Sequence, residues 1–200
     1  VLVAAIATAA SLEAKTVFEE NFMQYADYAP RLAPDKGIRC GTDPIWKQVG
    51  QVDVSVKAPC NLFRENIPVP ENGFNVTCRF KLNAKQPKTE KNKETGEVKV
   101  VEKGEASFFD LVFLDKDGKR ETIRVASDKI ATMPVDFLDN GWKSFGMKVR
   151  GTAVELWMAT DRSHEFKSVA KATLARKPAA FNFGCTPEKR FSLTDLFVTT

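Results

Sequence analysis

The sequence has little histidine and few cysteines, and it lacks a long apolar run. Its only histidine is His164, and its four cysteines include no Cys-x-x-Cys pair. A structural zinc site requires clustered Cys or His at short spacing, so we expect no metal site of this kind. No segment beyond residues 1–14 has the roughly 18 consecutive apolar residues of a membrane-spanning helix, so no membrane span is expected.

Charge of one sign is not concentrated anywhere in the chain. The 30 Lys and Arg residues nearly balance the 26 Asp and Glu residues, which leaves a net charge of +4, and the two signs alternate along most of the sequence. A nucleic-acid-binding domain typically gathers its basic residues on one arm, stripe or helix. Nucleic acid is therefore not expected as a partner.

Residues 1–14 resemble part of an export signal. The first ten residues, VLVAAIATAA, are apolar and small, and they are too few to span a bilayer. Such a run is typical of the apolar core and cleavage region of a secretory signal peptide. We predict a partial signal peptide cleaved after Ala10 or Ala14, and a secreted, periplasmic or cell-surface protein. The alternative is a short buried N-terminal helix or strand.

The cysteines suggest disulfides under that prediction. An even number of cysteines behind an export signal is typical of a disulfide framework. Three connectivities are available, and we favour the one that closes a loop-rich N-terminal region and ties an early strand to a late one. If the protein stayed in the cytosol, buried thiols would be expected instead. The favoured pairs are Cys40–Cys60 and Cys78–Cys185.

Alternation of apolar and polar residues predicts the fold class. Between residues 73 and 82 every second residue is apolar, and residues 107–114, 143–150 and 153–159 repeat the pattern. Period-two alternation is typical of strands with one buried and one wet face, and no long helical pattern competes with it. Residues 15–200 are therefore predicted to form one all-β domain, a two-sheet antiparallel β-sandwich or jelly roll. A polar insertion near residues 83–104 is predicted to be a loop or an exposed hairpin.

The second half of the chain resembles the concanavalin A-like lectin/glucanase superfamily, including laminin-G-like domains. The segments FFDLVFLDKDG, GWKSFGMKVRGTAVELWMATD and FNFGCTPEKRFSLTDLFVTT carry the resemblance. It implies a jelly roll that often binds glycans, with calcium held in loops of some members. The residues at the shared architectural positions are Trp142, Phe145, Val149, Val154, Leu156, Asp161, Asp195 and Val198.

Two enzyme branches of that superfamily fit this sequence poorly. The E-x-D-x-x-E strand of the glycosidases is absent, and His164 is preceded two residues earlier by Arg162 instead of the glutamine of the alginate-lyase-like branch. Asp115, Asp117 and Gly118 superficially resemble a calcium loop, but the further acids of such a loop are missing, so a plain hairpin turn is predicted there. No cofactor is expected, although the resemblance leaves room for a structural calcium ion.

Three functions follow from the residues predicted on the outer sheet faces. The first is a non-catalytic, lectin-like domain whose partner is a polysaccharide or another glycan, with a Trp side chain that stacks on a sugar ring. The second is a hydrolase in which Asp110 and Glu155 are the two carboxyls, provided that their strands are neighbours. The third is an adhesion or structural module, whose charged side chains only pair with one another. The predicted ligand-binding residues are Arg79, Asp110, Lys148, Arg150, Glu155 and Trp157.

Overall fold

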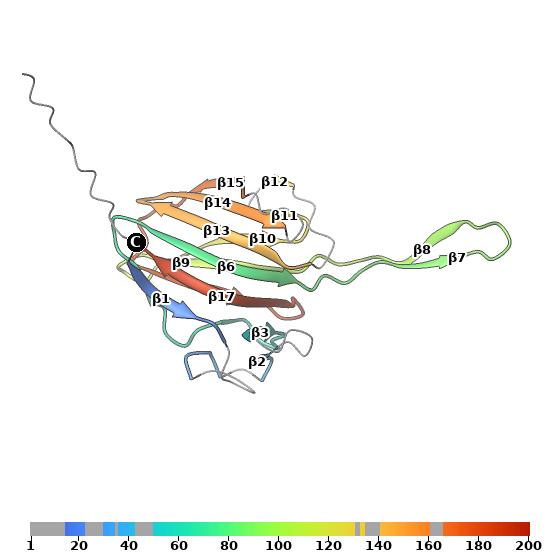
Figure 1. The fold of residues 1–200 in the computed structure, drawn as a ribbon, viewed down its shortest axis with the longest axis horizontal. Helices are drawn as coiled ribbons and strands as arrows, with labels where there is room; N and C mark the ends of the chain where they lie inside the picture. The colour runs from blue at the N-terminus through green and yellow to red at the C-terminus, as the bar shows by residue number, and fades with distance from the viewer. Residues whose placement is uncertain are drawn as a thin grey trace, which may run out of the picture.

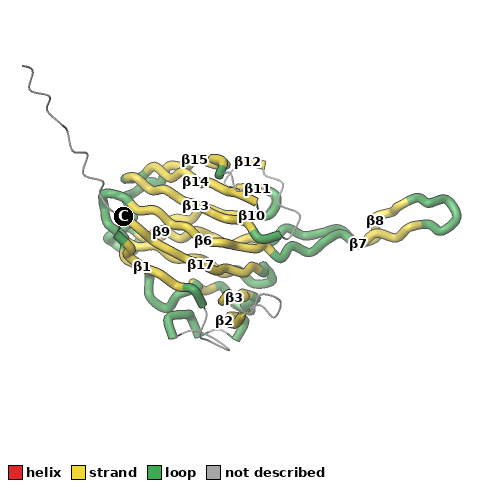
Figure 2. Tube along the Cα trace, in the orientation of Figure 1, coloured by secondary structure: helices red, strands yellow, loops and turns green. Residues whose placement is uncertain are grey.

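The chain folds into two antiparallel sheets that pack face to face, with a long hairpin projecting from one end (Figure 1). The computed structural model describes residues 15–22, 30–34, 36–42, 50–130, 133–134, 141–160 and 166–200. Strands and connecting segments make up these ranges, and no helix occurs within them (Figure 2). The predicted all-β sandwich is therefore confirmed. None of the described ranges holds a helix that could cross a membrane.

The large sheet contains the strands from both ends of the described chain. Its central strands β6 and β17 are flanked on one side by a meander and on the other by two short early strands, while β1 also pairs with β17. In sheet order the strands are β15 (Lys167–Thr173), β14 (Ala153–Thr160), β13 (Lys143–Arg150), β6 (Phe74–Leu82), β17 (Phe191–Thr199), β3 (Gly50–Val54) and β2 (Ile38–Thr42), with β1 (Thr16–Glu20) beside β17.

The small sheet is built around β9 and β16. The turn between β9 and β10 forms as predicted, because Asp115 Oδ1 accepts hydrogen bonds from the backbone of Asp117 at 2.9 Å and of Lys119 at 2.8 Å. In sheet order the strands are β12 (Met133–Pro134), β11 (Lys129–Ile130), β10 (Arg120–Ala126), β9 (Phe108–Leu114), β16 (Ala180–Cys185) and β4 (Cys60–Asn61), and β5 (Ile67–Pro68) also pairs with β16.

Phenylalanine rings from both sheets meet in the core between them. Phe109 of the small sheet lies 5.4 Å from Phe80 and 5.2 Å from Phe191 of the large sheet, measured between ring centroids. All three are fully buried. The alternating residues predicted to face inward are buried in β6, β9, β13 and β14, so period-two alternation did identify the inner faces.

The polar insertion forms a two-stranded arm. Strands β7 (Lys88–Lys91) and β8 (Val98–Glu102) pair with each other alone, joined by a turn in which Gly96 has a φ of 73°. An ion pair of 2.8 Å links Lys88 and Glu102. The exposed hairpin, one of the two predicted alternatives, is therefore the one observed (Figure 1).

The predicted disulfides are not present. All four cysteines lie in described residues and none forms a disulfide. The pairing Cys40–Cys60 would join β2 of the large sheet to β4 of the small one, and Cys78–Cys185 would likewise cross between the sheets. Cys60 lies instead opposite Cys185 in the small sheet. Counting cysteines could not reveal this arrangement, because it depends on which strands become neighbours.

Two predictions lie outside the described residues. They are the partial signal peptide over residues 1–14 and the region of His164 with Asp161.

Candidate functional site

Five of the six predicted ligand-binding residues share the outer face of the large sheet. Neighbouring strands place Glu155 opposite Lys148, and Trp157 opposite Gly146. These residues alternate with the buried core residues of β13 and β14, so their side chains point away from the core. The five residues are Arg79, Lys148, Arg150, Glu155 and Trp157.

A shelf of two aromatic side chains lies across this face. Phe166, just before β15, is 47% exposed, and Trp157 is half-buried. A Cβ atom added at Gly146 would lie 3.6 Å from Trp157 Cβ and 3.8 Å from Phe166 Cε1. Gly146 is half-buried, and both aromatic groups lie within van der Waals reach of its side-chain position. We call Trp157, Gly146 and Phe166 the aromatic shelf.

Glu155 is a fixed, ionised carboxylate beside the shelf. Its Oε1 accepts a hydrogen bond of 2.9 Å from Ser168 Oγ and lies 3.3 Å from Lys171 Nζ. The Ser168 hydrogen bond, followed by Lys171 and the Trp157 side chain, holds the pKa of Glu155 below its ordinary value. These contacts stabilise the negative charge, so Glu155 serves as a hydrogen-bond acceptor at neutral pH.

Trp142 extends the aromatic surface along the same face. The Arg79 guanidinium lies 5.7 Å from the Trp142 ring centroid, and Lys81 Nζ lies 5.4 Å from it. Both cations belong to outward positions of β6, so the half-buried ring packs on the outside of the sheet. The Trp142 side chain therefore lies over the outer face of the central strand β6 and not in the core between the sheets.

Asp110 does not belong to this face. It lies on β9 of the small sheet, where Arg124 donates two hydrogen bonds to its carboxylate, of 2.9 Å and 3.2 Å. Asp110 and the neighbouring outward residue Val112 are both buried, although the alternation predicted a wet face there. The outer faces of the two sheets point away from each other, so Asp110 and Glu155 do not converge as a carboxyl pair.

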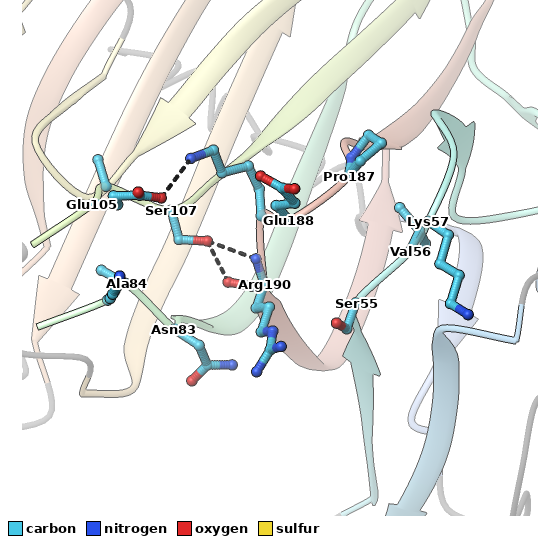
Figure 3. A pocket seen from close by; sticks show the side chains of 13 residues that line it. Ser55, Val56, Lys57, Asn83, Ala84, Glu105, Ser107, Pro187, Glu188 and Arg190 are labelled. Carbon is cyan, nitrogen blue, oxygen red and sulfur yellow. Dashed lines mark hydrogen bonds and ion pairs between the residues drawn. The ribbon is translucent and has the colours of Figure 1, made fainter.

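A pocket at the base of the arm was missed by the sequence analysis. Its cavity of 730 Å³ lies where four segments meet: the residues after β3, the two chain segments at the base of the arm, and the loop between β16 and β17 (Figure 3). These segments are far apart in sequence and carry no shared motif, so only the folded chain brings them together. The polar and charged lining residues are Ser55, Lys57, Asn83, Lys85, Glu105, Ser107, Glu188, Lys189 and Arg190.

Short hydrogen bonds hold the frame of this pocket. Ser107 Oγ donates to the Arg190 carbonyl at 2.5 Å and accepts from the Arg190 backbone N–H at 2.8 Å. The backbone N–H of Asn83 also donates to the Arg190 carbonyl, at 2.9 Å. With its backbone fixed from two sides, Arg190 extends its side chain beside that of Asn83 (Figure 3).

Cations outnumber carboxylates around the pocket. Lys57, Lys85, Lys189 and Arg190 line it together with two glutamates. Of these six side chains, Lys189 and Glu105 form a long ion pair of 3.9 Å. The described residues include no group of three or more His, Cys, Asp or Glu side chains arranged to hold a metal ion.

Comparison with known proteins finds similarity at the level of structure only. No protein-family model matches the chain, and no curated protein sequence matches it. Basic winged bean lectin with Tn-antigen is similar over 92% of this chain and 98% of its own, with 11% identity and a TM-score of 0.47.

Two further solved structures show the same kind of similarity. The CBM2 module of the evolved Dit protein of Lactobacillus casei BL23 phage J-1 covers 93% of this chain and 95% of its own, at 8% identity and a TM-score of 0.45. The lumenal domain of VIP36 is similar over 84% of this chain and 76% of its own, at 13% identity and a TM-score of 0.39. Lectins are thus among the similar structures, as the sequence resemblance predicted, and at these values the likeness says nothing of ligand or activity.

Proposed function

We propose that this chain is a non-catalytic, lectin-like domain that binds a glycan on the outer face of its large sheet. The observation that carries the proposal is the aromatic shelf, where Trp157 and Phe166 flank Gly146. Exposed large apolar side chains are costly to leave in water, and Trp157 and the 47% exposed Phe166 meet at Gly146 to give an aromatic surface. The C–H face of a sugar ring fits such a surface.

Polar groups around the shelf match the other side of such a ligand. Lys148 and Arg150 are exposed donors, and the ionised Glu155 is an acceptor. Sugar hydroxyls both donate and accept hydrogen bonds, and hydrogen bonds to charged groups are about twice as strong as neutral ones. Small-molecule sites likewise combine apolar and aromatic side chains with a small number of precisely placed polar groups.

The arrangement of acids supports binding without hydrolysis. A general acid needs a raised pKa, and the pKa of Glu155 is lowered. Asp110, the predicted second carboxyl, lies on the other sheet, where its carboxylate accepts two hydrogen bonds from Arg124. The signal-like residues 1–14 support a glycan encountered outside the cytosol.

Binding is tested by glycan-array screening followed by titration, with three variants that separate folding from recognition. Trp157→Ala removes half of the shelf, and Gly146→Leu places a large side chain between its two aromatic groups. Gly146→Ala is the matched control, because a Cβ atom there makes only ordinary contacts of 3.6 Å and 3.8 Å. We expect the first two variants to lose at least about ten-fold in affinity, and Gly146→Ala to bind nearly as the wild type does.

Two outcomes would count against the proposal. Wild-type affinity in Trp157→Ala and Gly146→Leu would move the glycan site elsewhere. No binding of any glycan by the wild-type chain would leave the adhesion or structural module as the better interpretation.

A further inference from the structure

Over strands β6, β13, β14 and β15 the outer face of the large sheet is cationic, whereas β1 and β3 place Glu19 and Asp53 on the same face. Outward side chains of β6, β13, β14 and β15 include five cations, and Glu155 is the only carboxylate among those described there. Glu155 is already engaged by Lys171. The Arg150 guanidinium donates to the Phe74 and Val149 carbonyls and to the Asn75 side chain, so these contacts leave its charge uncompensated.

The pocket at the base of the arm adds cations at one end of this face. Lys57 and Arg190 are exposed and form no ion pair with any described residue, whereas Lys85 is paired with Glu102 and Lys189 with Glu105. The planar guanidinium of Arg190 presents a fork of donors that matches a carboxylate or a sulfate. The Asn83 amide lies beside it as a neutral donor (Figure 3).

Strand β6 connects the shelf to the pocket without a break. Thr77 lies opposite Gly146, and the following outward positions are Arg79, Lys81 and then Asn83 at the pocket. At about 3.4 Å per residue, the six residues from Thr77 to Asn83 span roughly 20 Å. Asn83 Nδ2 donates to Ser192 Oγ at 3.3 Å, which ties the end of this path to the neighbouring strand β17.

We infer that the ligand is an acidic polysaccharide, whose chain stacks on the aromatic shelf and whose carboxylate or sulfate groups bind Lys57, Arg190 and Asn83 in the pocket. This inference rests on the proposed function. It adds the chemical class of the glycan and a second contact region to it.

The lining of the pocket favours an acidic sugar over a nucleic acid. No aromatic residue is among the side chains that line it, so a base has no stacking surface inside the pocket itself. Glu105 and Glu188 also line the pocket, so its lining is not uniformly basic, as a footprint for a nucleic-acid backbone usually is. Separate carboxylate or sulfate groups among sugar hydroxyls fit this mixture of cations, carboxylates and an amide.

The test measures binding of the full chain to matched polymers that differ in charge. The pairs are pullulan and pullulan sulfate, hydroxyethyl cellulose and carboxymethyl cellulose, and chondroitin and chondroitin sulfate, with single-stranded DNA as a further probe. We expect tighter binding of the more acidic member of at least one pair, and weakening as NaCl is raised. Carboxylated and sulfated polymers are compared to identify which anion the pocket prefers.

Variants that remove positive charge test whether the pocket binds the anionic groups of the ligand. Lys57→Gln combined with Arg190→Gln should lower affinity for the acidic polymer at least about ten-fold, because it removes two charged donors and losing one charged hydrogen bond already weakens binding by about that factor. The matched control, Lys116→Gln combined with Lys119→Gln, removes the same charge from the exposed β9–β10 turn and should change affinity less than about two-fold. Lys57→Glu alone is the second variant, should the double variant not fold.

The outcomes separate this inference from the proposed function. Equal binding of neutral and acidic polymers would overturn the inference and leave glycan binding in place. No binding of any polymer would overturn the proposed function itself. Equal losses in the pocket and control variants, or DNA binding as tight as that of the acidic polymer, would show charge attraction without a site and overturn the assignment of the pocket.

Discussion

Phe109 is expected to be the single most sensitive side chain of the core, because it joins the two sheets. Its ring is fully buried and lies 5.2 Å from Phe191, 5.4 Å from Phe80 and 5.7 Å from Phe183, centroid to centroid. Phe80 and Phe191 belong to the large sheet, and Phe183 is a neighbour in the small one. Phe109→Ala would therefore open a cavity at the junction of three aromatic contacts.

The size of the effect follows from that environment. Replacing a buried Phe by Ala typically costs about 3–5 kcal/mol, and each aromatic pair adds about 0.5–1.5 kcal/mol beyond buried area. The hydrogen-bonded strands on both sides keep the cavity from collapsing, so we expect a loss of about 4–5 kcal/mol for Phe109→Ala. Phe109→Leu keeps part of the volume and should cost about 1–2 kcal/mol. The larger loss is a substantial part of the roughly 5–15 kcal/mol that stabilises a typical domain.

The assay is urea unfolding followed by tryptophan fluorescence, with the free energy of unfolding compared between variants of equal m-value. Phe166→Ala is the control, because its ring is 47% exposed, and its cost should stay within about 0.5 kcal/mol. The reasoning would be refuted if Phe109→Ala cost less than about 1 kcal/mol, or if Phe166→Ala cost as much as Phe109→Ala.

Two further predictions concern a turn and a buried thiol. Gly73 has a φ of 123°, and a Cβ atom there would lie 2.4 Å from the Val149 carbonyl oxygen, so Gly73→Ala should lower the free energy of unfolding in urea by about 2–4 kcal/mol. Gly118 has a φ of 76° and open space around it, so Gly118→Ala should lower it by only about 1 kcal/mol. Equal losses in the two variants would contradict this account. Burial, and next the Asp195 charge, raise the pKa of the Cys78 thiol, so it should react with iodoacetamide at neutral pH only when the chain unfolds. A raised pKa means that the folded state holds the proton more tightly; the resulting stability is present below the ordinary thiol pKa and is lost as pH rises above it. Thermal melting between pH 8 and pH 10 should therefore fall less steeply for Cys78→Ala than for the wild type, and identical slopes would count against the assignment.

Strand positions were largely predictable because side-chain alternation is a local property. Residues 143–150 were predicted as a strand with the bounds that β13 has, and the predictions for β6, β9 and β14 each differ by one residue at one end. The short strands β2, β4, β5, β11 and β12 were not predicted. Four of them have only two residues, which is too few for a periodic pattern to be visible.

The outward face of the small sheet shows where alternation fails. Asp110 and Val112 alternate with Phe109 and Leu111 as predicted, yet both are buried. Alternation reports which face a side chain occupies and says nothing of what covers that face. Here the Arg124 side chain on the neighbouring strand β10 donates two hydrogen bonds to the Asp110 carboxylate. The alternation within β9 carries no information about that contact.

The sequence by itself determined the longer strands, their inward faces and five of the six residues on one outer face, since each depends on residues a few positions apart. Only the tertiary structure decided that Asp110 and Glu155 lie on opposite sides of the sandwich, that Cys60 lies opposite Cys185, and that Lys57 and Arg190 share a pocket. These outcomes depend on the order of strands within and between two sheets. That order is set by how the whole core packs, which no local pattern records.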